Sequence, residues 1–274
     1  MERNWQVPNA EYHEMKQKTS KYCIIIPIIN EGERIIKQLT KMKSFSNDID
    51  LVIVDGGSTD GSTNINLLQS MGVRTLIVKK DKGKLSSQLR IGYAYALKQG
   101  YEGIITIDGN DKDDVNAIPI FINELESGFD FIQGSRYIKG GKAVNTPIIR
   151  DVAIKLIHAP IISLVAGFRY TDTTNGFRGY SRRYILDPRV NPFREIFDTY
   201  ELLAYLSVRA SQLGFQTKEV PVTRKYPDDG KVPTKINSFS GNLSLLMILV
   251  KLIMGSYNPG NDIIEDEKGR SMNV

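Results

Sequence analysis

The chain has 274 residues, of which 41% are hydrophobic and 24% charged, as is ordinary for one large globular domain or a domain with an appendage. Its one cysteine, Cys23, excludes an intramolecular disulfide and a cysteine-rich metal site, and the apolar run around it predicts a buried thiol. The net charge of +5 is compatible with an anionic ligand, an anionic membrane surface or nucleic acid, and it selects none of them.

Residues 1–21 are polar and lack the apolar core of a signal peptide. We interpret them as an N-terminal extension, helical after Pro8, on a cytoplasmic protein. The longest apolar stretch, residues 243–254, is shorter than the about 20 residues that span a bilayer, so we expect no transmembrane helix.

Residues 22–29 form a nearly continuous apolar run, which is typical of a strand buried on both faces of a parallel sheet. Apolar residues at helical spacing and short apolar runs then alternate along the chain. The expected elements are a helix over 33–42, a strand over 50–55, a helix over 63–71, a strand over 73–78, a helix over 86–99 and a strand over 104–107. This alternation predicts an α/β fold with a doubly wound, Rossmann-like sheet.

The second half carries fewer regular signals. We expect a helix over 119–127, a strand over 129–133, a glycine-rich basic loop over 140–147, and an apolar helix over 150–167 that Pro160 breaks. An amphipathic helix over 197–213 and an apolar helix over 239–254 follow.

Three predicted loops meet at the carboxyl ends of the strands, where ligands of such sheets bind: residues 30–31, 55–60 and 108–114. Each contains acidic or amide side chains. Carboxylates such as Asp108 can hold Mg²⁺ or Mn²⁺, which neutralises a diphosphate, although Asp and Asn are also common turn residues. Neither a Gly-x-Gly-x-x-Gly turn nor a P-loop is present, so a metal ion would have to take over the handling of phosphates.

Residues 26–31, 54–61 and 108–110 resemble the three signature blocks of family-2 glycosyltransferases with the GT-A fold. Further blocks resemble the dolichyl-phosphate-mannose-synthase-like branch of that family, namely residues 134–137, 172–178, 209–215 and 219–222. The resemblance covers roughly residues 22–236. It implies a nucleotide-sugar half over 22–135 and an acceptor half over 136–236. Beyond the resemblance, the residue pattern predicts an apolar helix over 237–258 and a flexible polar tail over 259–274.

The family implies a UDP- or GDP-sugar donor, Mg²⁺ or Mn²⁺, and transfer with inversion. By this resemblance the metal ligands are Asp108 and Asn110, and the donor-binding residues are Pro27, Asn30, Glu31, Asp55, Gly57, Ser58, Lys84, Arg90, Asp108 and Gly109. Gly56 and Asn110 stand where an aspartate is usual. An amide adds no charge, so either Asp111 compensates or Asp108 alone suffices.

The acceptor determines which other groups are needed. A hydroxyl acceptor requires a general base, for which Asp172, Asp198 and Glu201 are candidates beside Asp108. A phosphate acceptor is already anionic and requires cations instead. The candidate acceptor-binding cations are Arg136, Arg178, Arg224 and Lys235.

We favour a polyprenyl-phosphate lipid as the acceptor. The alternatives are a sugar hydroxyl in cell-surface polysaccharide synthesis and a nucleotide-binding module without catalysis. We expect no nucleic-acid partner. The helix over 239–254 is apolar on most of its surface, so the core, a second subunit of a homodimer or lipid must cover it. Contact with lipid would place the protein peripherally at the inner face of the cytoplasmic membrane.

Overall fold

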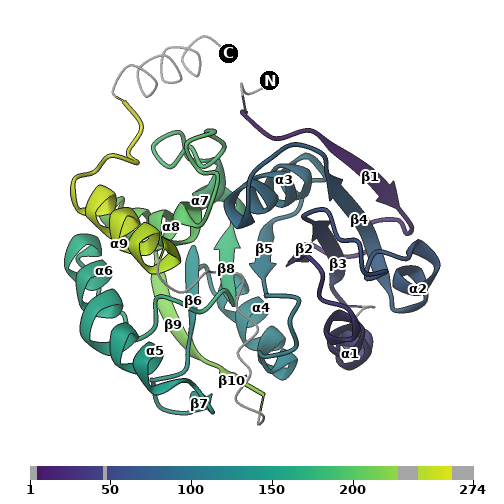
Figure 1. Ribbon diagram of the computed structural model, residues 1–274. Coiled ribbons are helices and arrows are strands. Elements are labelled where there is room, and N and C mark those ends of the chain that lie inside the picture. Colours follow the sequence, from purple (N-terminus) through teal and green to yellow (C-terminus); the bar gives the residue numbers. More distant parts are fainter. Residues whose placement is uncertain (1–4, 46–47, 228–239, 261–274) are drawn as a thin grey trace.

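The computed structural model describes residues 5–45, 48–227 and 240–260 (Figure 1). In this part of the chain, eight strands form one mixed sheet in the order β1-β4-β3-β2-β5-β8-β6-β9, and β10 and β7 form a small second sheet. The strands are β1 (Ala10–Glu14), β2 (Tyr22–Ile28), β3 (Asp50–Asp55), β4 (Val73–Lys79), β5 (Gly103–Thr106), β6 (Phe131–Ser135), β7 (Lys142–Val144), β8 (Arg178–Ser181), β9 (Thr217–Pro221) and β10 (Thr223–Lys225).

The helices cover both faces of the large sheet. They are α1 (Glu33–Met42), η1 (Lys43–Phe45), α2 (Ile65–Ser70), α3 (Leu85–Lys98), η2 (Val115–Ala117), α4 (Ile118–Glu126), α5 (Ile148–Ala153), η3 (Ile154–His158), α6 (Ala159–Ala166), α7 (Arg182–Leu186), α8 (Glu201–Gln212) and α9 (Ser240–Ile253). Strands β4, β3, β2 and β5 are parallel neighbours, whereas β8 runs antiparallel to both β5 and β6.

The order of the parallel strands fixes where a ligand can bind. From β2 the chain first moves outward through β3 to β4 and then returns to place β5 on the other side of β2. The loops after β2 and β5 therefore diverge at the carboxyl edge, and this switch point is where open α/β sheets bind their ligands. The loop carrying Asp108 begins at this point.

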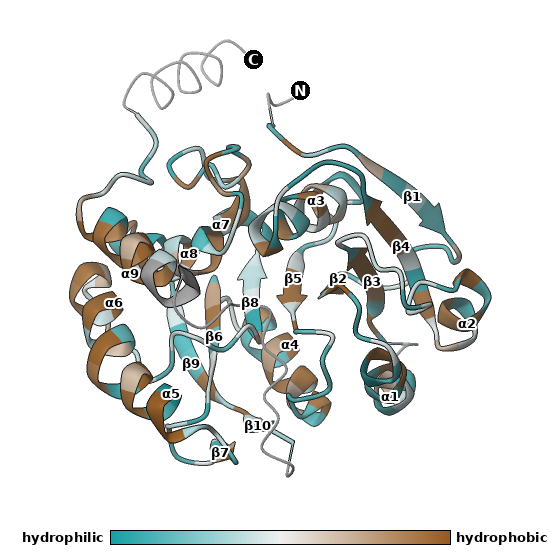
Figure 2. Cartoon of the chain, viewed as in Figure 1, coloured by the Kyte–Doolittle hydropathy of each residue, from teal (hydrophilic) through white to brown (hydrophobic). Residues whose placement is uncertain are grey.

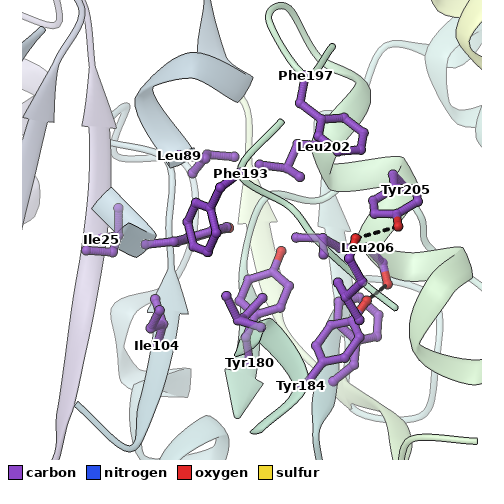
Figure 3. Close-up of a cluster of buried hydrophobic side chains, with 14 of the residues drawn as sticks. Ile25, Leu89, Ile104, Tyr180, Tyr184, Phe193, Phe197, Leu202, Tyr205 and Leu206 are labelled. Atoms are coloured by element: carbon purple, nitrogen blue, oxygen red, sulfur yellow. Dashed lines mark hydrogen bonds between the residues drawn. The ribbon is translucent and has the colours of Figure 1, made fainter. Parts of the chain in front are cut away.

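Two apolar cores lie on the two faces of the sheet, because successive side chains of a strand point to opposite faces. In β2, Cys23 and Ile25 belong to one core, while Ile24 and Ile26 belong to the other. Helices α3 and α8 close the first core, which is rich in aromatic side chains such as Tyr180 (Figure 3). Helices α1 and α4 close the second.

The predicted α/β sheet with helices on both faces is confirmed, but the N-terminal segment is not a helix. Residues 10–14 form β1, which pairs antiparallel with β4 and covers its outer edge. The ring of Tyr12 stacks on that of Tyr95, and the Tyr95 hydroxyl donates to Glu14 at 2.7 Å. The unpaired N–H and C=O groups at the edge of β4 favour a paired strand, and this outweighs the weak helical pattern of the short segment.

The break predicted at Pro160 lies earlier. Helix α5 passes into a π-helical turn, η3, and the helical backbone then continues through Pro160 into α6, so the irregularity precedes the proline. The C-terminal apolar helix is present as α9, packed against α6 and α8. Within the described ranges, no helix has both the length and the apolar character needed to cross a bilayer.

Candidate active site

Asp108 follows β5 and lies at the sheet edge against the segment over residues 172–178. Thr106 at the end of β5 donates to the carbonyl oxygen of Gly176 at 3.0 Å, which brings this segment beside the Asp108 loop. A Cβ added at Gly176 would lie 2.5 Å from Asp108 Oδ1. The glycine therefore makes the room that the carboxylate occupies.

Arg224 on β10 binds two carboxylates of this loop at once. Its Nη2 donates to Asp108 Oδ2 at 2.9 Å, and its Nη1 donates to Asp113 Oδ2. A backbone bridge between Asp113 and Arg224 joins the two segments as well. Arg224 and Asp113 are buried, whereas the Asp108 side chain is 28% exposed. Of the two carboxylates, Asp108 is therefore the one that is open to a ligand.

The charges of this cluster shift one another's ionisation. Burial acts to raise the pKa of Asp108, but the neighbouring Arg224 and Lys112 charges hold it below its usual value. Burial raises the pKa of Asp113 to about 6, in spite of Arg224. Burial acts to lower the pKa of Arg224, yet Asp113 and Asp108 raise it. Arg224 is thus a permanent cation at the rim of the site.

Two further residues extend the cationic side of the cluster. Lys112 is buried with its ammonium 5.1 Å from the centre of the Tyr226 ring, and burial together with the Arg224 charge lowers its pKa to about 8. Arg150 on α5 donates to the Tyr226 hydroxyl at 2.9 Å. Sequence reasoning missed Lys112, Asp113 and Arg150, because their partners come from segments far away in the chain.

The loops after β2 and β3 are joined, as the sequence predicted. Asn30 donates its N–H to Ser58 Oγ at 2.8 Å, and its Oδ1 accepts the Thr59 N–H at 2.8 Å. Asp55 is buried and accepts hydrogen bonds from the N–H groups of Gly57 (2.9 Å) and Ser58 (3.0 Å). Its first role is therefore to fix the loop along which a nucleotide would lie.

Gln88 on α3 contacts the strand ends from which these loops start, and the sequence did not predict this role. Its Nε2 donates to the carbonyl oxygens of Ile28 and Val54, both at 2.8 Å, which holds the ends of β2 and β3 together. A Cβ added at Gly56 would lie 3.1 Å from the same nitrogen. The glycine that stands in place of the usual aspartate is thus packed on Gln88.

The other predicted donor residues divide into two groups. The carbonyl oxygen of Pro27, near the end of β2, accepts the Gly109 N–H at 3.4 Å. Glu31 is paired with Arg34 at 2.8 Å. The predicted residues Pro27, Gly109 and Glu31 therefore lie at or near the same edge. Lys84 is exposed at the start of α3, with its ammonium 5.8 Å from the Tyr200 ring centre.

Arg90 does not join the donor group, contrary to the prediction. Its side chain is buried inside α3, and its guanidinium donates to the carbonyl oxygen of Gln6 in the N-terminal segment. A buried cation needs a partner, and the extension supplies it.

Asp172 and Arg136 were predicted as a catalytic base and an acceptor-binding cation, and neither prediction fits. They form a fully buried bidentate ion pair, with Arg136 Nε 2.6 Å and Nη2 2.9 Å from the two carboxylate oxygens. A carboxylate held in this way has no access to a substrate proton. The pair instead joins β6 to the segment that contains Gly176.

Arg178 is likewise a folding residue rather than an acceptor-binding one. It is buried and donates to the carbonyl oxygens of Asn175 (3.0 Å), Thr173 (2.9 Å) and Leu203. It thereby fastens the segment beside Asp108 to helix α8.

Glu201 begins α8 and is turned back on its own chain. Its Oε2 accepts the Thr199 N–H at 2.8 Å and its Oε1 accepts the Thr199 hydroxyl. This is the arrangement of a first-turn acid that satisfies a free backbone donor. Asp198 accepts the Ser87 hydroxyl at 2.7 Å. The last predicted acceptor residue, Lys235, lies outside the described residues.

A divalent cation at this edge would depend on few protein ligands. Among the described residues, no three His, Cys, Asp or Glu side chains gather closely enough to hold a metal ion. Asp113 is bound to Arg224, and Asp111 pairs with Lys41 at 2.6 Å. Mg²⁺ commonly takes only one or two carboxylates and completes its shell with water and substrate phosphates. Asp108 fits an ion of that kind. Asn110 would have to turn its amide, because its Nδ2 faces Asp108 Oδ2 at 3.5 Å and its Oδ1 accepts the Lys112 N–H at 3.3 Å.

A comparison with known families decides the relationship. The family model described as glycosyl transferase family 2 matches residues 23–187. The chain belongs to glycosyltransferase family 2. It is therefore a glycosyltransferase, and the sequence blocks that predicted this family are confirmed.

Two relatives specify the branch. An undecaprenyl-phosphate mannosyltransferase of Micrococcus luteus is 26% identical over 208 residues, which cover 73% of this chain and 81% of that protein. A polyprenol monophosphomannose synthase of Mycolicibacterium smegmatis is 26% identical over 208 residues, covering 75% and 77%. These relatives confirm the predicted resemblance to the dolichyl-phosphate-mannose-synthase-like branch.

Solved structures agree on the fold. Glucosyl-3-phosphoglycerate synthase of M. tuberculosis superposes with a TM-score of 0.61 at 14% identity, covering 85% of this chain and 80% of that one. A second structure of that synthase, in complex with Mn²⁺, UDP and glucosyl-3-phosphoglycerate, gives a TM-score of 0.58 at 14% identity over 85% of this chain and 77% of that one. This likeness confirms the predicted GT-A fold.

Proposed function

We propose that this glycosyltransferase moves a sugar from a UDP- or GDP-sugar to a polyprenyl phosphate, with inversion at the anomeric carbon. The names of the two relatives, which both contain a polyprenyl phosphate or polyprenol, support the acceptor class. The observation that carries the proposal is the contact between Arg224 and Asp108. It supports a phosphate acceptor, because a permanent cation lies beside the carboxylate at the sheet edge where the acceptor would meet the donor.

The distribution of charge favours a phosphate nucleophile over a hydroxyl. Two carboxylates that could serve as bases, Asp113 and Asp172, are held by arginines in buried ion pairs. Glu201 is bound to Thr199. With these three occupied, a hydroxyl acceptor would have to use Asp108 or the exposed Asp198 as its base, whereas an anionic phosphate needs cations, which Arg224 and Lys112 provide.

The reaction then requires no proton transfer. An oxygen of the acceptor phosphate forms a bond to the anomeric carbon, and the bond from that carbon to the donor diphosphate breaks on the opposite face. The nucleoside diphosphate leaves with the electron pair, and the configuration inverts. Mg²⁺ or Mn²⁺ held by Asp108 and Asn110 would stabilise the charge of the leaving diphosphate.

Asp113 gives Arg224 a fixed base from which to act. Nη1 is held by the buried Asp113, while Nη2 reaches the more exposed Asp108. We infer that Nη2 exchanges Asp108 for an oxygen of the acceptor phosphate while the bond to Asp113 persists.

A lipid acceptor also implies that the enzyme acts at a membrane surface. We propose peripheral association at the inner face of the cytoplasmic membrane, supported by exposed Leu246, Met247 and Val250 on α9.

The discriminating experiment compares Arg224→Ala with Glu201→Gln in a sugar-transfer assay with undecaprenyl phosphate and UDP- and GDP-sugars. We expect Arg224→Ala to lower turnover by about a hundredfold or more, the usual effect of removing one electrostatic contact to a reacting group. Glu201→Gln should stay within a few fold of the parent, about the effect of losing a local backbone hydrogen bond.

Two outcomes would contradict the proposal. Loss of turnover in Glu201→Gln with intact donor binding would indicate a hydroxyl acceptor. Absence of a thermal shift with every nucleotide sugar, both with Mn²⁺ and after EDTA, would contradict donor binding itself, because a bound ligand stabilises the fold by mass action.

A further inference from the structure

Helices α5 and α6 with the π-turn η3 between them expose large apolar side chains. Among the described residues, the five most exposed large hydrophobic side chains all lie on this unit or directly after α9: Ile149 (87%), Leu164 (84%), Ile148 (79%), Met254 (74%) and Leu156 (71%). Side chains of this kind at such exposure on neighbouring helices are unusual for a surface that faces only water.

The exposed side chains follow one side of the unit. Ile154, Ala159, Ile162 and Ala166 are buried against the core, while Ile149, Val152, Leu156 and Leu164 point away from it. A water-facing helix would carry polar residues at those outer positions. The unit is therefore apolar both toward the protein and away from it, as a helix needs to be when lipid covers its outer side.

Helix α9 extends this surface. It packs against α6, with Ile248, Leu249 and Leu252 in the core and Leu246, Val250 and Ile253 exposed. Figure 2 shows hydrophobic residues along α5, α6 and α9, which lie on the same side of the molecule. We call the outer residues of α5, η3 and α6, together with those of α9, the apolar face.

The charges within and beside the apolar face are mainly positive. Arg150 and Lys155 lie on α5 and η3, Lys251 lies on α9, and the exposed Lys139 and Lys142 border β7, which precedes α5. The one acid of the unit, Asp151, is occupied by Lys155 at 2.7 Å and by the Tyr137 hydroxyl at 2.8 Å. Apolar side chains with interspersed cations match the boundary between acyl chains and anionic headgroups.

The apolar face also connects to the catalytic cluster. Arg150 binds the Tyr226 hydroxyl at 2.9 Å, and the centre of the Tyr226 ring is 5.1 Å from the Lys112 ammonium and 5.9 Å from the Arg224 guanidinium carbon. Arg150 directly follows the exposed Ile148 and Ile149 in α5, so Arg150 and Tyr226 link the apolar face to the cations that would receive a phosphate.

We propose that the apolar face is seated in an anionic bilayer and delivers the acceptor phosphate to Arg224 along α5. Delivery of the acceptor phosphate rests on the proposed function, whereas the contact with the bilayer can be tested without it. The occupant is a lipid bilayer because the face is rimmed by cations, and a self-complementary contact between two copies would bring those cations together.

The test compares wild-type protein with the triple variant Ile149→Glu, Leu156→Glu, Leu164→Glu. Co-sedimentation uses vesicles of equimolar phosphatidylcholine and phosphatidylglycerol, and vesicles of phosphatidylcholine alone. We expect the wild type to prefer the anionic vesicles and the variant to bind them at least about tenfold more weakly, since three apolar contacts are replaced by charges that anionic lipid repels.

A matched control carries the same charge change at exposed apolar positions elsewhere, Tyr12→Glu, Ile65→Glu and Ile196→Glu, and should bind vesicles nearly like the wild type. Melting temperatures of both variants report on folding. Should the triple variant fail to fold, Ile149→Ser with Leu164→Ser should show the same loss in weaker form.

Turnover measurements separate the contact with the bilayer from the delivery of the acceptor phosphate. With undecaprenyl phosphate in vesicles the triple variant should lose activity in proportion to binding, whereas a water-soluble short-chain prenyl phosphate should be used as well as by the wild type. Absence of turnover with either acceptor, together with intact vesicle binding, would contradict the proposed function and leave the bilayer contact supported.

Three results would overturn the bilayer contact: a wild type that ignores both vesicle types, a triple variant that binds like the wild type, or a wild-type dimer that the triple variant converts to a monomer. The last result would identify the face as a subunit interface. Equal binding of the wild type to both vesicle types would contradict the proposed contact between the cations of the face and anionic headgroups.

Discussion

Gly176 controls the position of the central carboxylate by having no side chain. Because an added Cβ would lie 2.5 Å from Asp108 Oδ1, Gly176→Ala must push the carboxylate or the segment aside. We expect turnover to fall by about a hundredfold, as misplacement of a reacting group by an ångström commonly does. Steady-state kinetics and donor titration measure the effect. Gly260→Ala, where an added Cβ has open space, is the matched control and should leave turnover unchanged.

Asp172 offers a test of whether a fully buried charge serves folding or chemistry. Asp172→Asn leaves Arg136 buried without its counter-charge, and we expect a loss of about 3–5 kcal/mol in the free energy of unfolding. Denaturant unfolding measures it. The double variant Arg136→Leu, Asp172→Leu leaves no unpaired charge and should recover part of the loss. Unchanged stability of Asp172→Asn with abolished turnover would instead restore Asp172 as the catalytic base.

Sequence motifs located the residues whose role follows from chain-local geometry. Asp108, Asn30 and Ser58 lie where the strand-end pattern predicted them. Arg136 and Arg178 were assigned to the acceptor because they are cations, but a sequence does not show whether a carboxylate or carbonyl of the protein already binds a guanidinium. The role of Asp113 was missed for the same reason, since its partner Arg224 lies 111 positions away.

At the scale of elements, burial decided what could be predicted. The continuous apolar runs of β2, β3 and β5 predicted buried parallel strands, and those strands are present. The short strands β7 and β10 carry too few side chains for a periodic signal. Strand β1 is polar because it lies at the sheet edge, so its pattern has little apolar content, and only the pairing with β4 makes it a strand.

The role of β1 gives a prediction about stability. A chain that begins at residue 16 loses the pairing with β4, the Glu14 contact to Tyr95 and the carbonyl that binds the buried Arg90 guanidinium. We expect the melting temperature to fall by more than about 4 °C, since each kcal/mol shifts it by about 2–4 °C in a domain of this size. Thermal unfolding followed by circular dichroism measures this.

A matched control keeps the strand and removes only a surface contact. Glu11→Ala breaks an exposed ion pair with Lys80, and such pairs contribute about 0–1 kcal/mol. Its melting temperature should stay close to that of the parent chain. If the shortened chain melts like the parent chain as well, β1 is an appended strand that the sheet does not need.

At the scale of the whole molecule, the sheet separates two cores, and the residues of the candidate site come from both halves of the chain. Asp108 belongs to the predicted nucleotide-sugar half, and Arg224 to the predicted acceptor half. Strand β8 of the acceptor half joins the halves, because it lies between β5 and β6 of the nucleotide-sugar half and pairs with both. The division into donor and acceptor halves remains a prediction about function, since the sheet is continuous across it.

Cys23 provides a probe of how cooperatively this assembly unfolds. It is fully buried in β2, at the centre of the sheet, and burial raises the pKa of its thiol well above the usual value. A raised pKa keeps the thiol protonated at pH 8, and the thiolate is the reactive form. We therefore expect Ellman's reagent to label the native protein very slowly, and labelling to rise with guanidinium chloride over the same range as the loss of circular dichroism.

An exposed thiol tests the reagent under the same conditions. Lys98→Cys in a Cys23→Ser chain should react rapidly in native buffer, because residue 98 lies exposed at the end of α3. Rapid labelling of Cys23 before the circular dichroism changes would mean that β2 separates from β3 or β5 while the helices persist. Because β2, β3 and β5 all belong to the predicted nucleotide-sugar half, this half would then open locally before the whole protein unfolds.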